Sequence, residues 1–137
     1  MSVEAFLDTN ILVYAVSSAP SEESKRLRSE QLIANLDFGV SGQVLQEFYN
    51  AVTRKIAKPI SHDDAMGWIE DLSELEVIPV DSDLVTAGAE NCVRYQTSYW
   101  DGAIIAAAER SGAKTLYTED LNHGQTYGSV TVINPYI

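Results

Sequence analysis

Short apolar runs alternate along this chain with longer amphipathic stretches. The runs span three or four residues and predict strands buried on both faces, because such strands lack an alternating polar pattern. The stretches between them repeat apolar residues at helical spacing, as Val44, Phe48 and Val52 do. The predicted strands cover residues 5–7, 38–40, 76–79, 114–117 and 130–133. The predicted helices cover residues 10–16, 20–35, 43–54, the segment from the Ser61 cap through Leu72, 82–95 and 100–110.

Strands separated by helices predict an α/β fold. We expect a three-layer sandwich with a mostly parallel central sheet of about four to five short strands and helices on both faces. The chain has 137 residues and shows no internal repeat, low-complexity tract or linker, which predicts one domain over residues 1–137. In such sheets, ligands bind at the carboxyl ends of the strands.

Four acids lie at the ends or edges of these apolar elements. Asp8 directly follows the first predicted strand, and Asp120 follows the fourth. Glu47 lies on the border of an apolar helix face, and Asp101 lies in the first turn of an alanine-rich helix. If the fold brings these carboxylates together, they repel each other strongly unless cations are bound. The pattern favours a divalent-metal site, and metal-assisted phosphodiester chemistry is its natural use.

Each acid also has an ordinary structural explanation. Asp8 or Thr9 could cap the helix that follows. Asp101 could serve as a cap too, and the helix dipole at that position predicts a low pKa for its carboxylate. Glu47 could be solvated or paired on its helix, and Asp120 could be a plain loop acid. Taken singly, none of these positions specifies chemistry.

The formal net charge of −11 argues against non-specific wrapping of nucleic acid. The positive residues are nevertheless grouped. One group is Lys25, Arg26 and Arg28, and the other is Arg54, Lys55 and Lys58. Solvated helix faces and phosphate contact explain both groups equally well, so the two interpretations stay open.

The sequence also predicts the cellular compartment of the protein. No apolar run is long enough to cross a bilayer, and the first residues lack the basic start and apolar stretch of a signal peptide. Cys92 is the only cysteine, which excludes an intramolecular disulfide. We expect a cytoplasmic protein without a membrane partner.

Taken together, the acids and their flanking residues resemble a known family. The motifs are Leu7-Asp8-Thr9-Asn10, Glu47-Phe48, Tyr99-Trp100-Asp101-Gly102-Ala103 and Tyr117-Thr118-Glu119-Asp120-Leu121-Asn122-His123-Gly124. In this order they look like a PIN domain and are most similar to VapC-type ribonuclease toxins of type II toxin–antitoxin systems. The resemblance extends over the whole chain.

The resemblance implies a PIN-like sandwich and an Mg²⁺- or Mn²⁺-dependent endoribonuclease that cleaves a structured RNA, such as a tRNA-like hairpin or an rRNA loop, by activated water. It implies a VapB-like antitoxin and a homodimer as partners. The residues that match the family's metal-binding and catalytic acids are Asp8, Glu47, Asp101 and Asp120. The residues that match its supporting polar positions are Thr9, Asn10 and Thr118.

Two other functions remain. Phosphatases of the haloacid dehalogenase type also carry an acid after their first strand, in an Asp-x-Asp pattern. Here Asn10 stands at the second acid position and no matching lysine motif is present. A PIN-like module that binds a protein or RNA without catalysis is the other alternative, although a scaffold has no need for a repulsive acid cluster.

Overall fold

The computed structural model describes residues 2–137. A six-stranded sheet with the order β3-β2-β1-β4-β6-β5 forms its centre. All neighbouring strands are parallel except β5 and β6. The strands are β1 Ala5–Leu7, β2 Phe38–Ser41, β3 Glu76–Ile78, β4 Thr115–Tyr117, β5 Thr126–Tyr127 and β6 Val130–Ile133.

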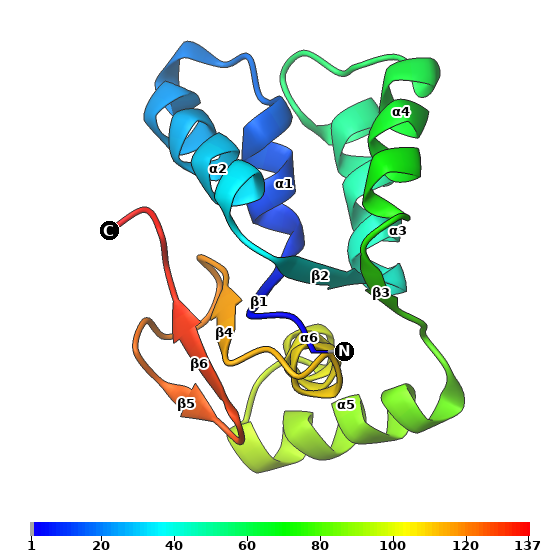
Figure 1. Cartoon of the computed structure of the whole chain (residues 1–137), viewed down its shortest axis with the longest axis vertical. Coiled ribbons are helices and arrows are strands. Elements are labelled where there is room, and N and C mark those ends of the chain that lie inside the picture. The colour runs from blue at the N-terminus through cyan, green and yellow to red at the C-terminus, as the bar shows by residue number, and fades with distance from the viewer. Residues whose placement is uncertain (1) are drawn as a thin grey trace.

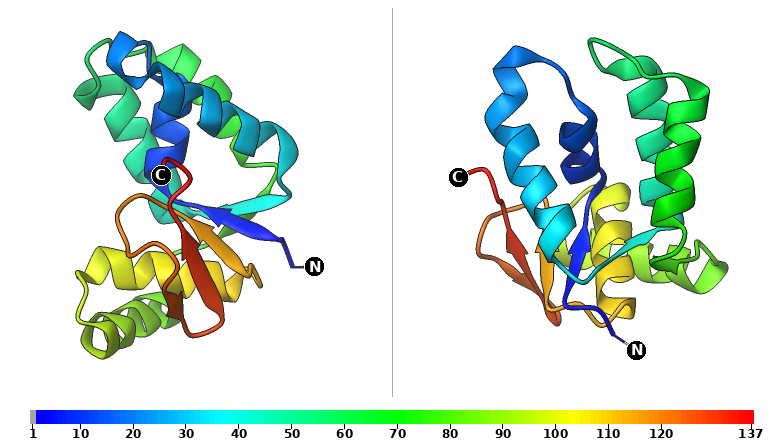
Figure 2. Two further views of the ribbon diagram at one scale, coloured as in Figure 1. Left: turned by 90° about the vertical axis from the view of Figure 1, so that its left-hand side faces the viewer. Right: turned by 45° about the horizontal axis from the view of Figure 1, so that its top comes forward.

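Helices cover the sheet on two sides (Figure 1). The helices α1 to α4 lie on one side of the sheet, and α5 and α6 lie on the other, as both views in Figure 2 show. The helices are α1 Thr9–Val16, α2 Glu23–Asn35, α3 Gly42–Asn50, α4 His62–Leu72, α5 Ser82–Tyr95 and α6 Tyr99–Arg110. A short 3₁₀ turn, η1 Pro20–Glu22, precedes α2, and a π-helical turn, η2 Ala51–Lys55, continues α3.

The predicted fold class is confirmed, and the five predicted strands are present. The expected number of strands was slightly low, because β5 has only two residues and leaves no pattern in the sequence. It forms because Gly128, at a φ of +59°, reverses the chain so that Tyr127 pairs with Val130. The helix expected over residues 43–54 ends as a π-turn rather than a regular α-helix. Within residues 2–137, no helix combines the length and apolarity needed to span a bilayer.

The position of β1 in the core explains why its sequence is a continuous run of apolar residues. Phe6 and Leu7 are fully buried at the middle of the sheet, and Ile105 of α6 is fully buried as well. Helices α5 and α6 approach each other at Gly102, where an added Cβ atom would lie 2.5 Å from the Gly88 carbonyl oxygen and 2.8 Å from the Cys92 nitrogen. This close approach holds the first turn of α6 in place.

Candidate functional site

The pairing of β1 with β4 brings the first and last motifs together. Leu7 pairs with Tyr117, and the Asp8 backbone N–H donates to the Tyr117 carbonyl at 3.1 Å. One residue further along, the fully buried Thr118 hydroxyl donates to Asp8 Oδ2 at 2.9 Å. Asp8 also caps α1, since its Oδ1 accepts from the Thr9 N–H at 2.7 Å. The capping interpretation of Asp8 is therefore correct, and it coexists with the placement at the carboxyl edge of the sheet.

Asn10 joins the loop after β4 to the start of α1. Its Nδ2 donates to Asp120 Oδ2 at 3.0 Å and to Thr118 Oγ1 at 3.3 Å. The Asp120 backbone N–H donates to Thr118 Oγ1 at 3.1 Å. These contacts hold Asp120 beside Asp8, although 112 positions separate the two in sequence. Asn10 Oδ1 is buried and lacks a hydrogen-bond partner.

Glu47 reaches the same edge from α3. Ser41, the last residue of β2, caps this helix by accepting from the Val44 N–H at 3.2 Å. The side chain of Glu47 lies exposed one turn later and its Oε1 accepts from the Thr9 hydroxyl at 2.9 Å. Of the two ordinary explanations, solvation agrees with this exposure, whereas a pairing with cations on its own helix is not seen within residues 2–137, where Glu47 bonds across to α1.

Asp101 comes from the opposite side of the sheet. Ser98 caps α6 by accepting from the Asp101 backbone N–H at 3.1 Å, so Asp101 is not the cap. The sequence-based expectation of a low pKa is wrong. Partial burial raises the pKa of Asp101, and the charges of Asp120 and Glu47 raise it further, while the hydrogen bond with Ser98 lowers it. Burial and the nearby acids together outweigh the hydrogen bond with Ser98.

The electrostatics of Asp8 identify the same cluster. Burial raises the pKa of Asp8 from its usual 3.8 to about 7, against the opposing effect of hydrogen bonds from Thr9 and Thr118. The charges of Asp120 and Glu47 add to the increase. Both Asp8 and Asp101 are therefore affected by the same two acids, which shows that the fold brings all four into one electrostatic cluster.

The donor set of this cluster suits a hard divalent cation. Carboxylate, amide and hydroxyl oxygens are the ligands that Mg²⁺ and Mn²⁺ prefer. As they stand, no three acidic, histidine or cysteine side chains of residues 2–137 are arranged to hold an ion jointly. Glu47 and Asp120 are exposed and Asp101 is half-buried, so a cation from solvent can reach their carboxylates and relieve their repulsion. The unpartnered Asn10 oxygen could accept a hydrogen bond from a water on such an ion.

Tyr14, which the sequence did not single out, and Lys25 of the first basic group support the loop after β4. The Tyr14 hydroxyl donates to Glu119 Oε1 at 2.6 Å, and Lys25 Nζ lies 3.1 Å from Glu119 Oε2. Tyr14 follows Asn10 by one helical turn, and this spacing was the available signal. His123 of the same loop accepts from the Asn134 backbone N–H at 3.0 Å, so it ties the loop to the C-terminal segment.

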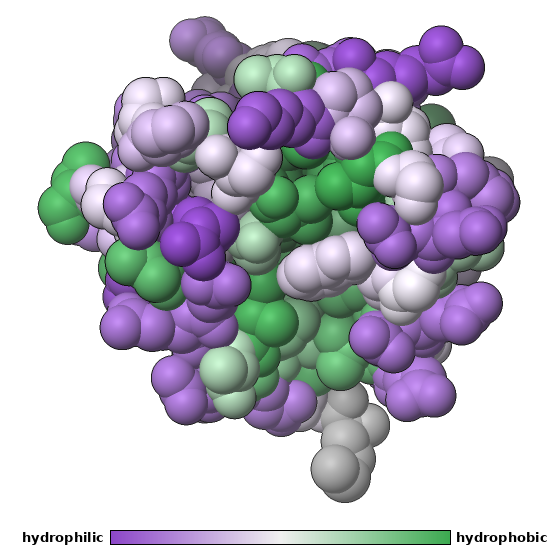
Figure 3. Space-filling view, turned by 90° about the horizontal axis from the view of Figure 1, so that it is seen from above, coloured by the Kyte–Doolittle hydropathy of each residue, from purple (hydrophilic) through white to green (hydrophobic). Residues whose placement is uncertain are grey.

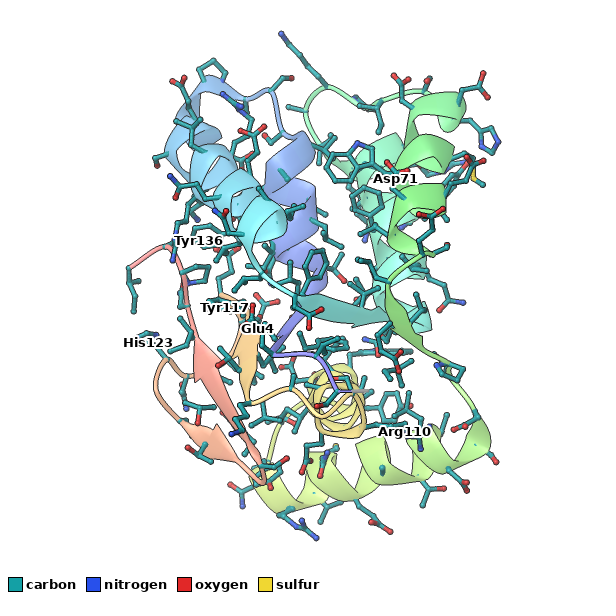
Figure 4. The ribbon with its side chains drawn as sticks, viewed as in Figure 1. Glu4, Asp71, Arg110, Tyr117, His123 and Tyr136 are labelled. Atoms are coloured by element: carbon teal, nitrogen blue, oxygen red, sulfur yellow. The ribbon has the colours of Figure 1, made fainter. Side chains whose placement is uncertain are left out.

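A wide groove lies on the face formed by α1, α2 and α4. Its volume is about 930 Å³, and its apolar lining includes Ala15, Phe38 and Trp68. Viewed from the top of Figure 1, apolar surface occupies the middle of this face with polar residues around it (Figure 3). The rim carries acids of α4, and Asp71 lies beside the groove in Figure 4. The acids that line the groove are Asp63, Asp64, Glu70 and Asp71.

The fold and this acid cluster define an α/β protein with four candidate acids gathered at the carboxyl edge of a mostly parallel sheet. A family model described as the PIN domain matches residues 5–128, and the chain belongs to the PIN domain family. The comparison with curated proteins gave no match.

Solved structures share the fold. A toxin–antitoxin complex from Klebsiella pneumoniae is 18% identical, with a TM-score of 0.70 over 97% of this chain and 98% of that chain. VapC20 from Mycobacterium tuberculosis, described as a sarcin–ricin loop cleaving toxin, is 20% identical, with a TM-score of 0.67 over 85% and 92%. VapBC2 from Rickettsia felis, bound to a promoter DNA fragment, is 23% identical, with a TM-score of 0.59 over 93% and 96%. At these identities the likeness establishes the fold.

Proposed function

We propose that this protein is a divalent-metal-dependent endoribonuclease and the toxin of a VapBC-type toxin–antitoxin pair. The observation that carries the proposal is the gathering of Asp8, Glu47, Asp101 and Asp120 at one sheet edge, where burial raises the pKa of Asp8 and Asp101 and the charges of Glu47 and Asp120 raise it further. Membership of the PIN family and the folds of the toxin structures support it. The same membership removes the support for a dehalogenase-type phosphatase.

Each residue would have a distinct task. Asp8 and Asp101 would hold Mg²⁺ or Mn²⁺, with Glu47 and Asp120 completing the acid cluster. A bound divalent cation would supply an acidified water and neutralise charge on the scissile phosphate. Thr118 and Thr9 orient the Asp8 and Glu47 carboxylates by donating to them, and Asn10 fixes Asp120. No side-chain nucleophile is needed in this chemistry.

Cleavage of structured RNA tests this proposal. The purified protein is incubated with a pool of structured RNAs in Mg²⁺, in Mn²⁺ and in EDTA, beside the variants Asp8→Asn and Asp101→Asn. We expect metal-dependent cleavage that each substitution reduces by orders of magnitude. Asp37→Asn removes an exposed charge elsewhere and serves as the matched control. Cleavage that survives loss of either carboxylate would contradict the mechanism, and metal-independent binding without cleavage would favour the non-catalytic module.

The groove on the α1, α2 and α4 face supports an antitoxin as partner. Its apolar lining and acidic rim suit an amphipathic segment with positively charged residues, a common arrangement for a helix that docks in a groove. On α1 the groove is lined by Ala15 and Val16, at the end of the helix away from the Asp8 cap, so such a segment would lie about two helical turns from the acid cluster. Expression of the wild-type protein in a bacterial host should arrest growth, whereas expression of Asp8→Asn should not.

A homodimer would use a different surface. Val85, Ala89 and Val93 follow one another at helical spacing along the outer side of α5, and Val93 is 79% exposed. A row of exposed apolar residues of this kind marks an association surface. Val93→Asp should therefore convert a dimer into a monomer in light scattering. A monomeric wild-type protein, or a variant that stays dimeric, would exclude this surface.

A further inference from the structure

The two groups of positive residues, which the sequence could not distinguish, have different surroundings in the structure. In the α2 group, Lys25 pairs with Glu119 at 3.1 Å and Arg26 pairs with Glu30 at 2.9 Å. Arg28 donates to a backbone carbonyl of the C-terminal segment at 3.4 Å. These charges are engaged within the protein and are poorly placed to bind an external anion.

The second group, which we term the basic segment, consists of Arg54, Lys55 and Lys58. All three side chains are exposed, and none has a carboxylate partner within residues 2–137. Arg54 and Lys55 end the π-turn η2, where the helix dipole stabilises cations. Lys58 lies beyond the end of η2, so the dipole does not account for it. The chain thus concentrates three uncompensated positive charges on one exposed segment despite its net charge of −11.

A cavity extends from Lys55 of the basic segment to Asn10, the neighbour of the acid cluster. It has a volume of about 500 Å³ and runs along one side of α1. Lys55 lines one part of it, and Asn10, which donates to Asp120, lines another. A ligand in this cavity would therefore contact Lys55 at one end and, at the other, the amide that holds Asp120.

The remaining lining suits a nucleotide better than a bare anion. Glu119 and Glu22 also face the cavity, and both are already engaged, Glu119 by Lys25 and Glu22 by the Ser17 hydroxyl. Carboxylate oxygens have several acceptor positions, so they remain able to accept from ribose hydroxyls and base amino groups. The cavity thus has a cation for a phosphate group next to carboxylate acceptors for a sugar and a base.

We propose that the basic segment and this cavity bind the phosphodiester backbone of the RNA next to the cleaved bond, and so position the substrate on the acid cluster. The inference rests on the proposed nuclease function and names the surface through which an acidic protein contacts RNA. The three side chains contact phosphates and take no part in bond breaking. An acidic protein is the other class of partner that could occupy a basic segment, and the experiment distinguishes it.

The test compares two triple variants with equal charge. Arg54→Gln/Lys55→Gln/Lys58→Gln removes the basic segment, and Arg28→Gln/Arg94→Gln/Lys114→Gln removes three charges elsewhere. Binding of a labelled hairpin RNA that the wild type cleaves is measured by anisotropy across a salt series, with Asp8→Asn added to prevent cleavage. Single-turnover cleavage is measured with Asp8 intact, and thermal melts confirm folding.

Removal of the basic segment should weaken RNA binding at least tenfold at low salt. It should also reduce the slope of log affinity against log salt by roughly two, because each phosphate contact to single-stranded RNA contributes about 0.7. Cleavage at saturating protein should be nearly unchanged. The control variant should match the wild type in RNA affinity and in salt dependence.

Equal effects in the two variants, or an unchanged slope in the first, would overturn the inference and leave an acidic protein as the partner. A wild type that neither binds nor cleaves RNA would instead refute the proposed function, and with it the inference.

Discussion

Replacement of Asp8 by asparagine should stabilise the metal-free protein at alkaline pH. The folded state raises the pKa of Asp8 above its ordinary value, so the folded protein holds this proton more tightly than the unfolded chain. Stability linked to this group is therefore present at low pH and is lost as the pH rises from 3.8 through about 7. Above that range the folded protein retains a buried, repelled carboxylate, and asparagine removes it.

The magnitude follows from the same pKa. A change from 3.8 to about 7 corresponds to roughly 4 kcal/mol of unfolding free energy, at about 1.4 kcal/mol for each tenfold step. Asparagine can accept from Thr9 but cannot also accept from Thr118, which costs about 1 kcal/mol. We expect a net gain of roughly 2–3 kcal/mol at pH 8, or roughly 5–10 °C in Tm. Near pH 5 the gain should almost disappear.

Thermal unfolding between pH 4.5 and 8.5 in EDTA measures this gain, with Asp37→Asn as the control. A second series in Mg²⁺ separates the two roles of the carboxylate. Mg²⁺ that binds only the folded state should raise the Tm of the wild type and leave the Tm of Asp8→Asn unchanged. A variant that is no more stable than the wild type at pH 8, or whose advantage does not shrink with falling pH, would refute the electrostatic reasoning.

Three further predictions concern the groove, the margin of the site and the α5–α6 contact. Gly67 lines the groove and has open space beside it, so Gly67→Trp should keep ribonuclease activity but should no longer be inhibited by the antitoxin. If the antitoxin still inhibits this variant, the antitoxin binds elsewhere. Trp100 is 61% exposed next to Asp101, and loss of base stacking in Trp100→Ala should raise KM by about tenfold. Trp100→Phe should have an intermediate KM, and an unchanged KM in Trp100→Ala would exclude stacking. Gly102→Ala should lower the free energy of unfolding by roughly 1–3 kcal/mol in denaturant titrations, because the backbones of α5 and α6 must move apart. Gly67→Ala, where the added Cβ meets open space, should raise it by up to about 1 kcal/mol.

The sequence predicted those parts of the molecule that depend on local pattern. The strands around Phe6 and Val40 could be recognised because burial on both faces leaves only apolar residues. Asp8 and Asp120 could be placed because residues that follow parallel strands meet at one edge. Glu47 and Asp101 could not be placed by pattern, since a helix position does not specify which side chains come near it. Their role was inferred only through motif order.

Long-range contacts account for the remaining differences. The pKa of Asp101 was misjudged because packing against other elements partly buries the carboxyl, and Asp120 and Glu47 approach it from two of those elements. The two basic groups could not be distinguished because the partner of Lys25, Glu119, lies 94 positions away in the chain. Each of these features depends on the packing of distant segments, which no local window contains.

The pairing of β1 with β4 has a consequence for the timing of protein synthesis. The strand that precedes Asp8 ends at Leu7, but its central neighbour begins only at Thr115. A growing chain that has not reached this point lacks Thr118 and Asp120, and Asp8 is without its side-chain hydrogen-bond donor. At about 5–20 residues per second, several seconds of synthesis pass between the two strands. The topology thus delays assembly of the candidate site until β4 has been made, and a product released before that point would lack the site.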